Sequence, residues 1–225
     1  MRLDNSGGVQ RLPGLDVGVN LVDVEGTSVG PVQSLTLNQM LLDEGGAVWV
    51  DANDNARTSH FTKIAPSMRF LDRIRVARGF TAFQHLSTVR DAEPELCGDT
   101  AVLVLPDVDY LYTEDNLREG EGREMLESTL KTVRGYSRKY EVPVLVTRRY
   151  GYPDVVSSYT DRVIECRMTE MGPRFSSGEF ETLVYAGDRY VQTTLALWRR
   201  ILEKQYVDVK GVEPEAGPRE APTVI

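Results

Sequence analysis

Cysteine and histidine, the residues that build most disulfide frameworks and many metal sites, are scarce. The 225-residue chain contains two of each. Cys97 and Cys166 are too few and too far apart in sequence for a disulfide framework or a metal knuckle, so we expect buried, reduced thiols. His60 and His85 have no cysteine or carboxylate pattern nearby and are expected to be surface or hydrogen-bonded helix residues. The sequence therefore predicts no metal site.

Long apolar runs are also missing. No run approaches the ~20 residues that a membrane-spanning helix needs, and residues 1–6 lack the apolar core of a signal peptide. We therefore expect a cytoplasmic protein with no membrane contact. The formal net charge of −8 disfavours nucleic-acid binding over the whole surface, because neutralising phosphates requires basic residues. A local basic patch is still compatible with this charge.

Lysine is also rare in this sequence. Only 5 of the 26 basic residues are lysines, and none occurs before Lys63. A phosphate-binding loop of the Walker A type uses a lysine to reach the terminal phosphates of a nucleotide. Residues 1–62 cannot supply that lysine.

The centre of the chain carries the clearest secondary-structure pattern. Residues 101–105 form an unbroken apolar run of strand length, which is typical of a strand covered on both faces. Apolar residues then recur at three- and four-residue steps from 123 to 140, which predicts a helix. Residues 142–147 form a second apolar strand. Strand, helix and strand in this order predict a right-handed βαβ unit in the centre of a parallel sheet.

Other segments extend this unit into one α/β domain. Alternating or continuous apolar residues predict further strands at 17–24, 47–51 and 74–80. Segments that mix apolar and charged positions predict an antiparallel extension at one sheet edge, at 161–167 and 179–185. Helices are expected in part of 61–70, around His85 and at 194–206. The predicted domain covers residues 12–207, after a loose arm at 1–11 and before a disordered, proline-containing tail at 208–225.

Three segments resemble the RecA/RadA recombinase core, namely residues 101–112 (AVLVLPDVDYLY), 130–140 (LKTVRGYSRKY) and 142–149 (VPVLVTRR). In its pattern of strands and turns the resemblance extends over residues 12–185. It implies a RecA-like P-loop NTPase fold of the α/β class, with a mainly parallel central sheet flanked by helices and an antiparallel edge extension.

The loop after the first strand departs from the Walker A motif of that family. If Gly26 takes the place of the first glycine, Val32 falls where the lysine belongs and Gln33 where the magnesium-binding hydroxyl belongs. Shifting the register by one residue offers Ser34 as a hydroxyl, but still no lysine. An ordinary strand-to-helix turn is the favoured alternative. The residues that could form a vestigial nucleotide site here are Gly26, Gly30, Gln33 and Ser34.

Two further positions depart from the family pattern. The family has a glutamate at the end of its second strand that activates water, and Asn53 falls on it, whereas Arg57 matches an arginine of the family. The family also has a magnesium-orienting aspartate at the end of the strand that resembles 101–105. Pro106 falls on that place, with Asp107 one step later. An amide cannot act as a general base and proline offers no ligand. The resemblance therefore implies the fold without ATP hydrolysis, and we expect neither ATP nor magnesium as a cofactor.

The resemblance implies a non-catalytic RecA/RadA-like paralogue of the archaeal type, an accessory in DNA recombination or repair that binds a protein partner, with a recombinase as one candidate. Two alternatives stay open. A weak ATPase would bind ATP and magnesium through Ser34, Asp54 and Asp107. A single-stranded DNA-binding accessory would use Arg148 and Arg149, which stand beside two tyrosines, to contact phosphates and stack bases.

Overall fold

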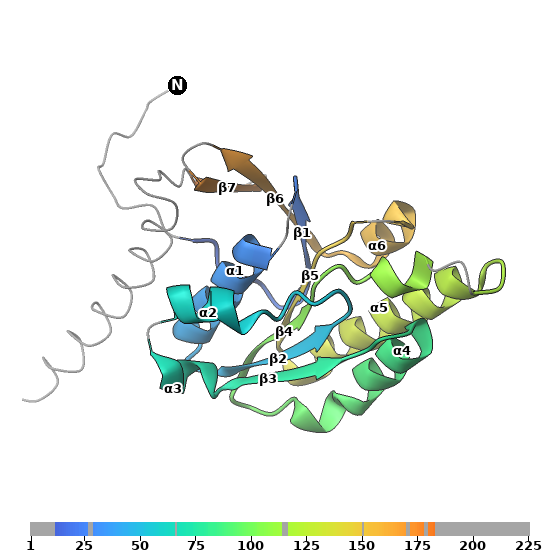
Figure 1. The fold of residues 1–225 in the computed structure, drawn as a ribbon, viewed down its shortest axis with the longest axis horizontal. Coiled ribbons are helices and arrows are strands. Elements are labelled where there is room, and N and C mark those ends of the chain that lie inside the picture. Colours follow the sequence, from blue (N-terminus) through green and yellow to red (C-terminus); the bar gives the residue numbers. More distant parts are fainter. Residues whose placement is uncertain are drawn as a thin grey trace, which may run out of the picture.

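The computed structural model describes residues 12–26, 29–65, 67–113, 117–149, 151–169, 172–177 and 180–182. Within these residues one eight-stranded sheet forms the centre of the molecule, in the order β3-β2-β4-β5-β1-β6-β7-β8 (Figure 1). The strands are β1 (Gly18–Val24), β2 (Gly46–Asp51), β3 (Ile74–Arg78), β4 (Thr100–Leu105), β5 (Pro143–Val146), β6 (Arg162–Thr169), β7 (Gly172–Ser177) and β8 (Phe180–Thr182).

Strands β1 to β6 all run parallel. β4 and β5 are direct neighbours, with Val104 opposite Leu145, and helix α5 (Glu121–Tyr140) connects them. The predicted βαβ unit is therefore confirmed, and so is a mainly parallel sheet of the α/β class.

The antiparallel part of the sheet is placed differently from the prediction. β6 is parallel to β1, with Leu21 opposite Val163, and antiparallel to β7, with Cys166 opposite Phe175, so the antiparallel prediction for 161–167 holds only for the outer side of this strand. Helix α6 (Pro153–Tyr159), which the sequence did not predict, fills the connection from β5 and carries the chain back so that β6 runs parallel. The antiparallel extension consists of β7 and β8, and the part of 179–185 that the structure describes lies in β8.

Helices cover both faces of the sheet. One layer contains α1 (Val29–Leu42), α2 (Thr58–Ile64) and α3 (Met68–Leu71), and the other contains α4 (Ala82–Asp91), α5 and α6. The side chains of β4 divide between the layers as the period of a strand requires. Val102 and Val104 pack in the α1 layer, and Leu103 and Leu105 pack in the α5 layer. The unbroken apolar run of this strand is explained by burial on both faces.

Helix α1 is enclosed rather than amphipathic. It contains no charged residue, and every residue from Pro31 to Leu41 is buried. A helix without a polar face must satisfy its polar side chains internally. Asn38 donates from Nδ2 to the carbonyl of Pro13 at 3.0 Å, and Gln39 accepts the backbone N–H of Leu15 at 2.8 Å. The segment before β1 is thereby fastened over the helix.

The chain connections change direction between β1 and its neighbour β5. From β1 the chain crosses through α1 to β2 on one side, whereas from β4 and β5 it proceeds through α5 and α6 on the opposite face. In open α/β sheets, ligands bind beyond the carboxyl ends of the strands at such a switch point. By this rule, a ligand site is expected at the loops that follow β1, β2, β4 and β5.

Several predictions concern residues outside those that the structure describes. They are the arm at 1–11, the helix at 194–206 and the tail at 208–225. Among the described helices, none combines the length and the apolar character needed to cross a membrane.

Candidate functional site

The carboxyl edge of the sheet gathers acidic and amide side chains from loops that are distant in sequence. Asp51 ends β2 and begins a loop with Asn53 and Asn55, Asp107 follows β4, and Thr147 follows β5. Because these strands are adjacent in the sheet, the loops meet at one place. The hydrogen bonds among these side chains determine which ligands the cluster can bind.

Asp107 lies at the centre of the cluster. It is fully buried, with a positive φ of 48° that brings its side chain back over the strand ends. Its Oδ2 accepts hydrogen bonds from the Nδ2 atoms of Asn53 and Asn55, both at 3.0 Å, and its Oδ1 accepts the Thr147 hydroxyl at 3.1 Å. A carboxylate only accepts, so both amides must present their NH2 groups to it. These donors occupy lone pairs through which a carboxylate would bind magnesium.

Asp51 holds the amide-bearing loop in shape. Its carboxylate accepts the backbone N–H of Asn55 at 2.9 Å and that of Ala56 at 3.1 Å, and the Nε of Arg78 lies 3.6 Å away. The Asp51 side chain is buried, so these bonds compensate for its lost hydration. These hydrogen bonds hold the loop in a fixed conformation, in which Asn53 and Asn55 reach Asp107.

The segment that was compared with the Walker A motif is mostly helix. Helix α1 begins at Val29, so only residues 25–28 connect it to β1. Gly26 stands in this turn with a positive φ of 100°, a conformation that favours glycine, whereas Gly30 lies in the first turn of the helix. Val32, at the place of the lysine, is fully buried and packs in the core of the α1 layer. Its side chain does not reach the site.

Gln33 and Ser34 are both buried in α1. The Nε2 of Gln33 donates to the carbonyls of Asn55, at 2.9 Å, and Arg57, at 3.4 Å, so this side chain ties α1 to the loop after β2. Its Oε1 is buried without a hydrogen-bond partner among the described residues. Gln33 therefore fastens the loop where the family would place a metal-binding hydroxyl.

Arg57 and Asp54 form an exposed ion pair with each other. The Nε of Arg57 lies 3.3 Å from a carboxylate oxygen of Asp54, and the other oxygen is 3.4 Å from Arg78 Nη1. All three side chains are well exposed, at 58%, 61% and 44%. The structure thus brings Arg57 and Asp54 to each other, at the rim of the site.

The two arginines after β5 are held by acidic residues. Arg148 Nη2 lies 3.1 Å from Asp23 Oδ2, which follows from the pairing of β5 with β1. The backbone N–H of Arg149 donates to the buried carboxylate of Asp109 at 3.0 Å, and so does that of Gly151 at 2.7 Å. Asp109 thereby shapes the loop after β5. The Arg148 guanidinium, predicted to contact phosphate, is already paired.

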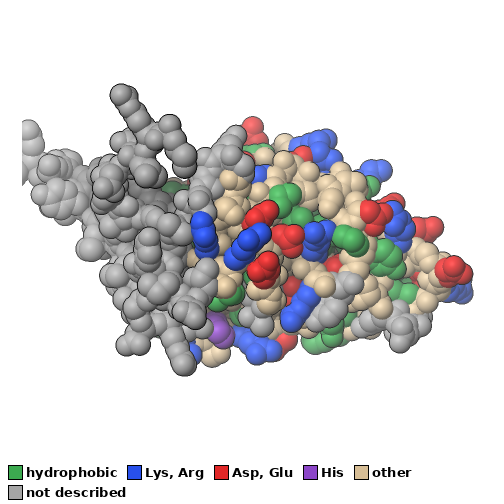
Figure 2. Space-filling model, turned by 90° about the horizontal axis from the view of Figure 1, so that it is seen from above, with side chains coloured by type: hydrophobic (Ala, Val, Ile, Leu, Met, Phe, Trp, Pro, Cys, Tyr) green, Lys and Arg blue, Asp and Glu red, His purple; other side chains and the backbone are tan. Residues whose placement is uncertain are grey.

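A hollow of about 450 Å³ opens beside these arginines. It is lined by Asp23, Val24, Gly26, Asp109, Arg148, Arg149, Gly151 and Pro153. On the face shown in Figure 2, acidic and basic side chains are interspersed and no broad field of one sign appears on the described surface. The hollow offers both charges to a ligand rather than a positive cradle for phosphates.

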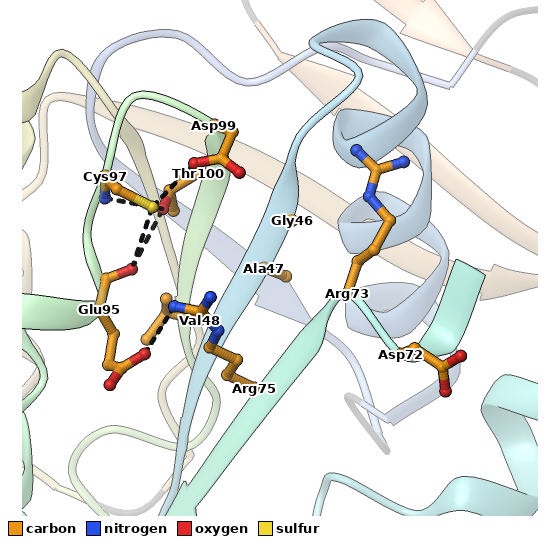
Figure 3. Close-up of a pocket in the computed structure, with 10 residues that line it drawn as sticks. All are labelled: Gly46, Ala47, Val48, Asp72, Arg73, Arg75, Glu95, Cys97, Asp99 and Thr100. Atoms are coloured by element: carbon orange, nitrogen blue, oxygen red, sulfur yellow. Dashed lines mark hydrogen bonds and ion pairs between the residues drawn. The ribbon is translucent and has the colours of Figure 1, made fainter. Parts of the chain in front are cut away.

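A second hollow lies at the opposite, amino edge of β2, β3 and β4 and has a volume of about 180 Å³ (Figure 3). Cys97 is exposed there, so the expectation that both thiols are buried was wrong for this residue. It lies in the turn before β4 rather than in the strand, and its thiol donates to Asp99 Oδ1 across 2.8 Å. Across the hollow, Arg75 forms an ion pair with Glu95 at 2.6 Å. Cys166 is buried, as predicted.

Sequence reasoning missed Asn55, Thr147 and Asp109. Asn55 and Asp109 stand in turns, where asparagine and aspartate are common, and Thr147 ends an apolar strand. Only the order of the strands in the sheet shows that Asn55 and Thr147 meet at one carboxylate.

No protein-family model matches the chain, and no curated protein matches its sequence. Within the described residues, no group of three or more histidine, cysteine or acidic side chains could hold a metal ion.

Proposed function

We propose that the chain is a RecA-like domain that does not hydrolyse nucleotides and acts as a partner-binding accessory in DNA recombination or repair. The fold supports the first part, because β4, α5 and β5 stand as adjacent elements in the centre of a parallel sheet. These elements contain the segments that resemble the RecA/RadA core. The role in recombination or repair follows from that resemblance by analogy of fold.

The network around Asp107 carries the proposal that hydrolysis is lost. Phosphoryl transfer needs a cation that neutralises the developing charge and a group that orients the attacking water. At Asp107, the carboxylate one residue after the family's metal position, three side chains donate hydrogen bonds, from Asn53, Asn55 and Thr147. A nucleotide with its metal would have to displace these bonds, and Val32 would offer no charge to hold its phosphates.

The ATPase alternative finds less support. Its three residues were Ser34, Asp54 and Asp107, and they do not converge on one point. Ser34 is buried within α1, and Asp54 is paired at the exposed rim with Arg57 and Arg78. Of the three, only Asp107 lies in the hydrogen-bonded cluster with Asn53 and Asn55.

The DNA-binding alternative depends on Arg148 and Arg149. The guanidinium of Arg148 is 3.1 Å from Asp23, so binding a DNA phosphate would have to break this ion pair. Arg149 is exposed and lines the hollow. We therefore rank this role below partner binding.

Nucleotide turnover and nucleic-acid binding by the full chain test the proposal. We expect no release of phosphate from ATP with magnesium, and no change on Asp107→Ala. Hydrolysis that Asp107→Ala abolishes would overturn the proposal in favour of the ATPase. Salt-dependent binding of single-stranded DNA that is lost in an Arg148→Ala, Arg149→Ala variant would favour the DNA-binding role instead. For the partner, the chain immobilised as bait should retain recombination or repair proteins from the host extract.

A further inference from the structure

Strand β3 has an outer edge with no partner strand in the described part of the chain. It stands at the end of the strand order (Figure 1). Its inner edge bonds to β2, for example from Ala47 N to Arg73 O and from Gly79 N to Asp51 O, each at 3.0 Å. Backbone groups of alternate residues point to opposite edges of a strand. The residues whose N–H and C=O groups point outward are therefore Ile74, Val76 and Arg78.

Exposed apolar side chains lie along this edge and at both of its ends. Met68 is 64% exposed on α3, just before the strand, and Val76 is 46% exposed at its centre. Phe80 and Phe83 are 74% and 58% exposed just after it. Single exposed apolar residues are normal, but four around one unpaired strand edge are characteristic of an interaction surface.

The two charged residues of β3 are already paired with acidic residues. Arg75 pairs with Glu95 at 2.6 Å, and Arg78 lies 3.6 Å from Asp51 and 3.4 Å from Asp54. A second strand with the same charges could therefore approach this edge without strong repulsion between unpaired arginines.

We propose that the β3 edge pairs with the β3 edge of a second copy of this chain, so that the two sheets continue into one another across a two-fold axis. Two identical edges related in this way run antiparallel. All three outward-facing residues are paired only when Val76 stands opposite Val76 of the second copy, with Ile74 opposite Arg78; a shift by two residues leaves one of the three without a partner. This register forms about six backbone hydrogen bonds, two for each facing pair.

The same register is favourable for the side chains. Arg75 stands opposite Ala77 of the second copy and Arg78 opposite Ile74, so no like charges face each other. The carboxyl end of each β3 then lies beside the amino end of the other. Phe80 is thereby brought toward α3 of the second copy, where Met68 is exposed. Met68 and Phe80, one at each end of the edge, thereby lie near each other across the interface.

This complementarity selects a second copy rather than an extended peptide of another protein. A single added strand would pair with the backbone groups and cover Val76. It would bring no specific apolar partner to Met68 and Phe80, which lie beyond the two ends of the strand. In a two-fold interface the same patch meets itself, and each end of the edge supplies what the other end lacks. The inference does not depend on the proposed function, since dimerisation requires neither nucleotide nor DNA.

Sedimentation velocity of the full chain over a range of concentrations tests the dimer. We expect a species of twice the chain mass of 25.2 kDa. Val76→Lys places two ammonium groups across the axis and should raise the dissociation constant more than about tenfold. Val163→Lys is the matched control, because Val163 is 47% exposed on β6, far from this edge in the sheet order, and its variant should dimerise normally.

Disulfide cross-linking tests the register in a Cys97→Ser background. Val76→Cys should cross-link two copies, because facing residues of a hydrogen-bonded antiparallel pair have Cα atoms ~5.5 Å apart, within the range of a disulfide. Ala77→Cys should not, because two copies of residue 77 would be diagonal neighbours at ~7–8 Å. A chain that stays monomeric at every concentration would overturn the proposal. So would a dimer that Val76→Lys leaves intact, or cross-linking by Ala77→Cys alone.

Discussion

The Nδ2 atom of Asn55 lies 3.0 Å from Oδ2 of Asp107, although the two residues are 52 positions apart in the sequence. This hydrogen bond joins the loop after β2 to the turn after β4. Both residues are buried, at 2% and 0% exposure, so water cannot easily replace either partner. The site is therefore also a structural clamp between two neighbouring strands.

Removing Asn55 from this clamp should destabilise the protein. Asn55→Ala leaves a buried carboxylate with one donor fewer, and a hydrogen bond to a charged group contributes ~1.5–3 kcal/mol. Asn53→Ala should cost less, because Asn53 is only half-buried and water can take its place. Urea unfolding of both variants measures the difference. Adding Asp107→Ala to Asn55→Ala should show a coupling energy between ~0.5 and 3 kcal/mol. Strictly additive effects would contradict the clamp.

A lysine introduced at position 32, the place of the Walker A lysine in the family that the sequence resembles, should not create nucleotide binding. Val32 is fully buried in the core beside β2 and β4, so Val32→Lys places an unpaired ammonium among apolar side chains. We expect a loss of more than ~3 kcal/mol in unfolding free energy, and no gain of ATP affinity in a calorimetric titration. Val32→Ala, which only removes volume, should cost about 1–3 kcal/mol. A stable Val32→Lys protein that binds ATP would show that the segment can still form a phosphate loop.

The sequence predicted the parts of the fold that have long, regular patterns. β4 is an unbroken apolar run and α5 has 20 residues with one apolar stripe, so each element is buried in a way that its own composition reveals. α6 has only seven residues, and β7 contains a glycine, a proline and two serines, so neither carries a pattern of its own. Their conformations depend on packing against the finished sheet.

The candidate site was predictable only in part, for a related reason. Asp107 could be found because it follows a recognisable strand. Its partners Asn55 and Thr147 could not, since a strand pattern gives no order of strands in the sheet and their meeting follows from that order. The paired state of Arg148 is likewise a consequence of β5 lying beside β1.

The two thiols should differ in reactivity. Cys97 is exposed, whereas Cys166 is buried between strands, and burial raises the pKa of its thiol to about 12. The thiolate is the reactive form, so Cys166 should be inert in the folded protein. A chromogenic disulfide reagent should therefore titrate one thiol per chain under native conditions and two in denaturant. Cys97→Ser should abolish the native reaction, and a remaining fast native thiol would contradict the burial of Cys166.

Buried His85 should make stability depend on pH. Its Nδ1 lies 2.7 Å from the Tyr112 hydroxyl, which in turn lies 2.7 Å from the Thr129 hydroxyl, so the three side chains link α4, the turn after β4 and α5. Burial lowers the pKa of His85 to about 4, from a usual value near 6.5. Between these two values the unfolded chain binds a proton that the folded chain does not.

The contribution of neutral His85 to the free energy of unfolding is therefore fully present above pH 6.5 and is lost as the pH falls toward 4. The slope is about 1.4 kcal/mol per pH unit, which amounts to a loss of ~2 kcal/mol between pH 6.5 and pH 5. Acidic residues titrate over the same range, so the informative quantity is the difference between the parent and His85→Gln, measured by urea unfolding at several pH values. The parent should lose stability more steeply than the variant as the pH falls. Parallel curves would contradict the prediction, because they would mean that His85 accepts its proton in the folded protein. The Tyr112→Phe variant is the control. It removes the hydroxyl but leaves His85 buried, so it should keep the steeper slope.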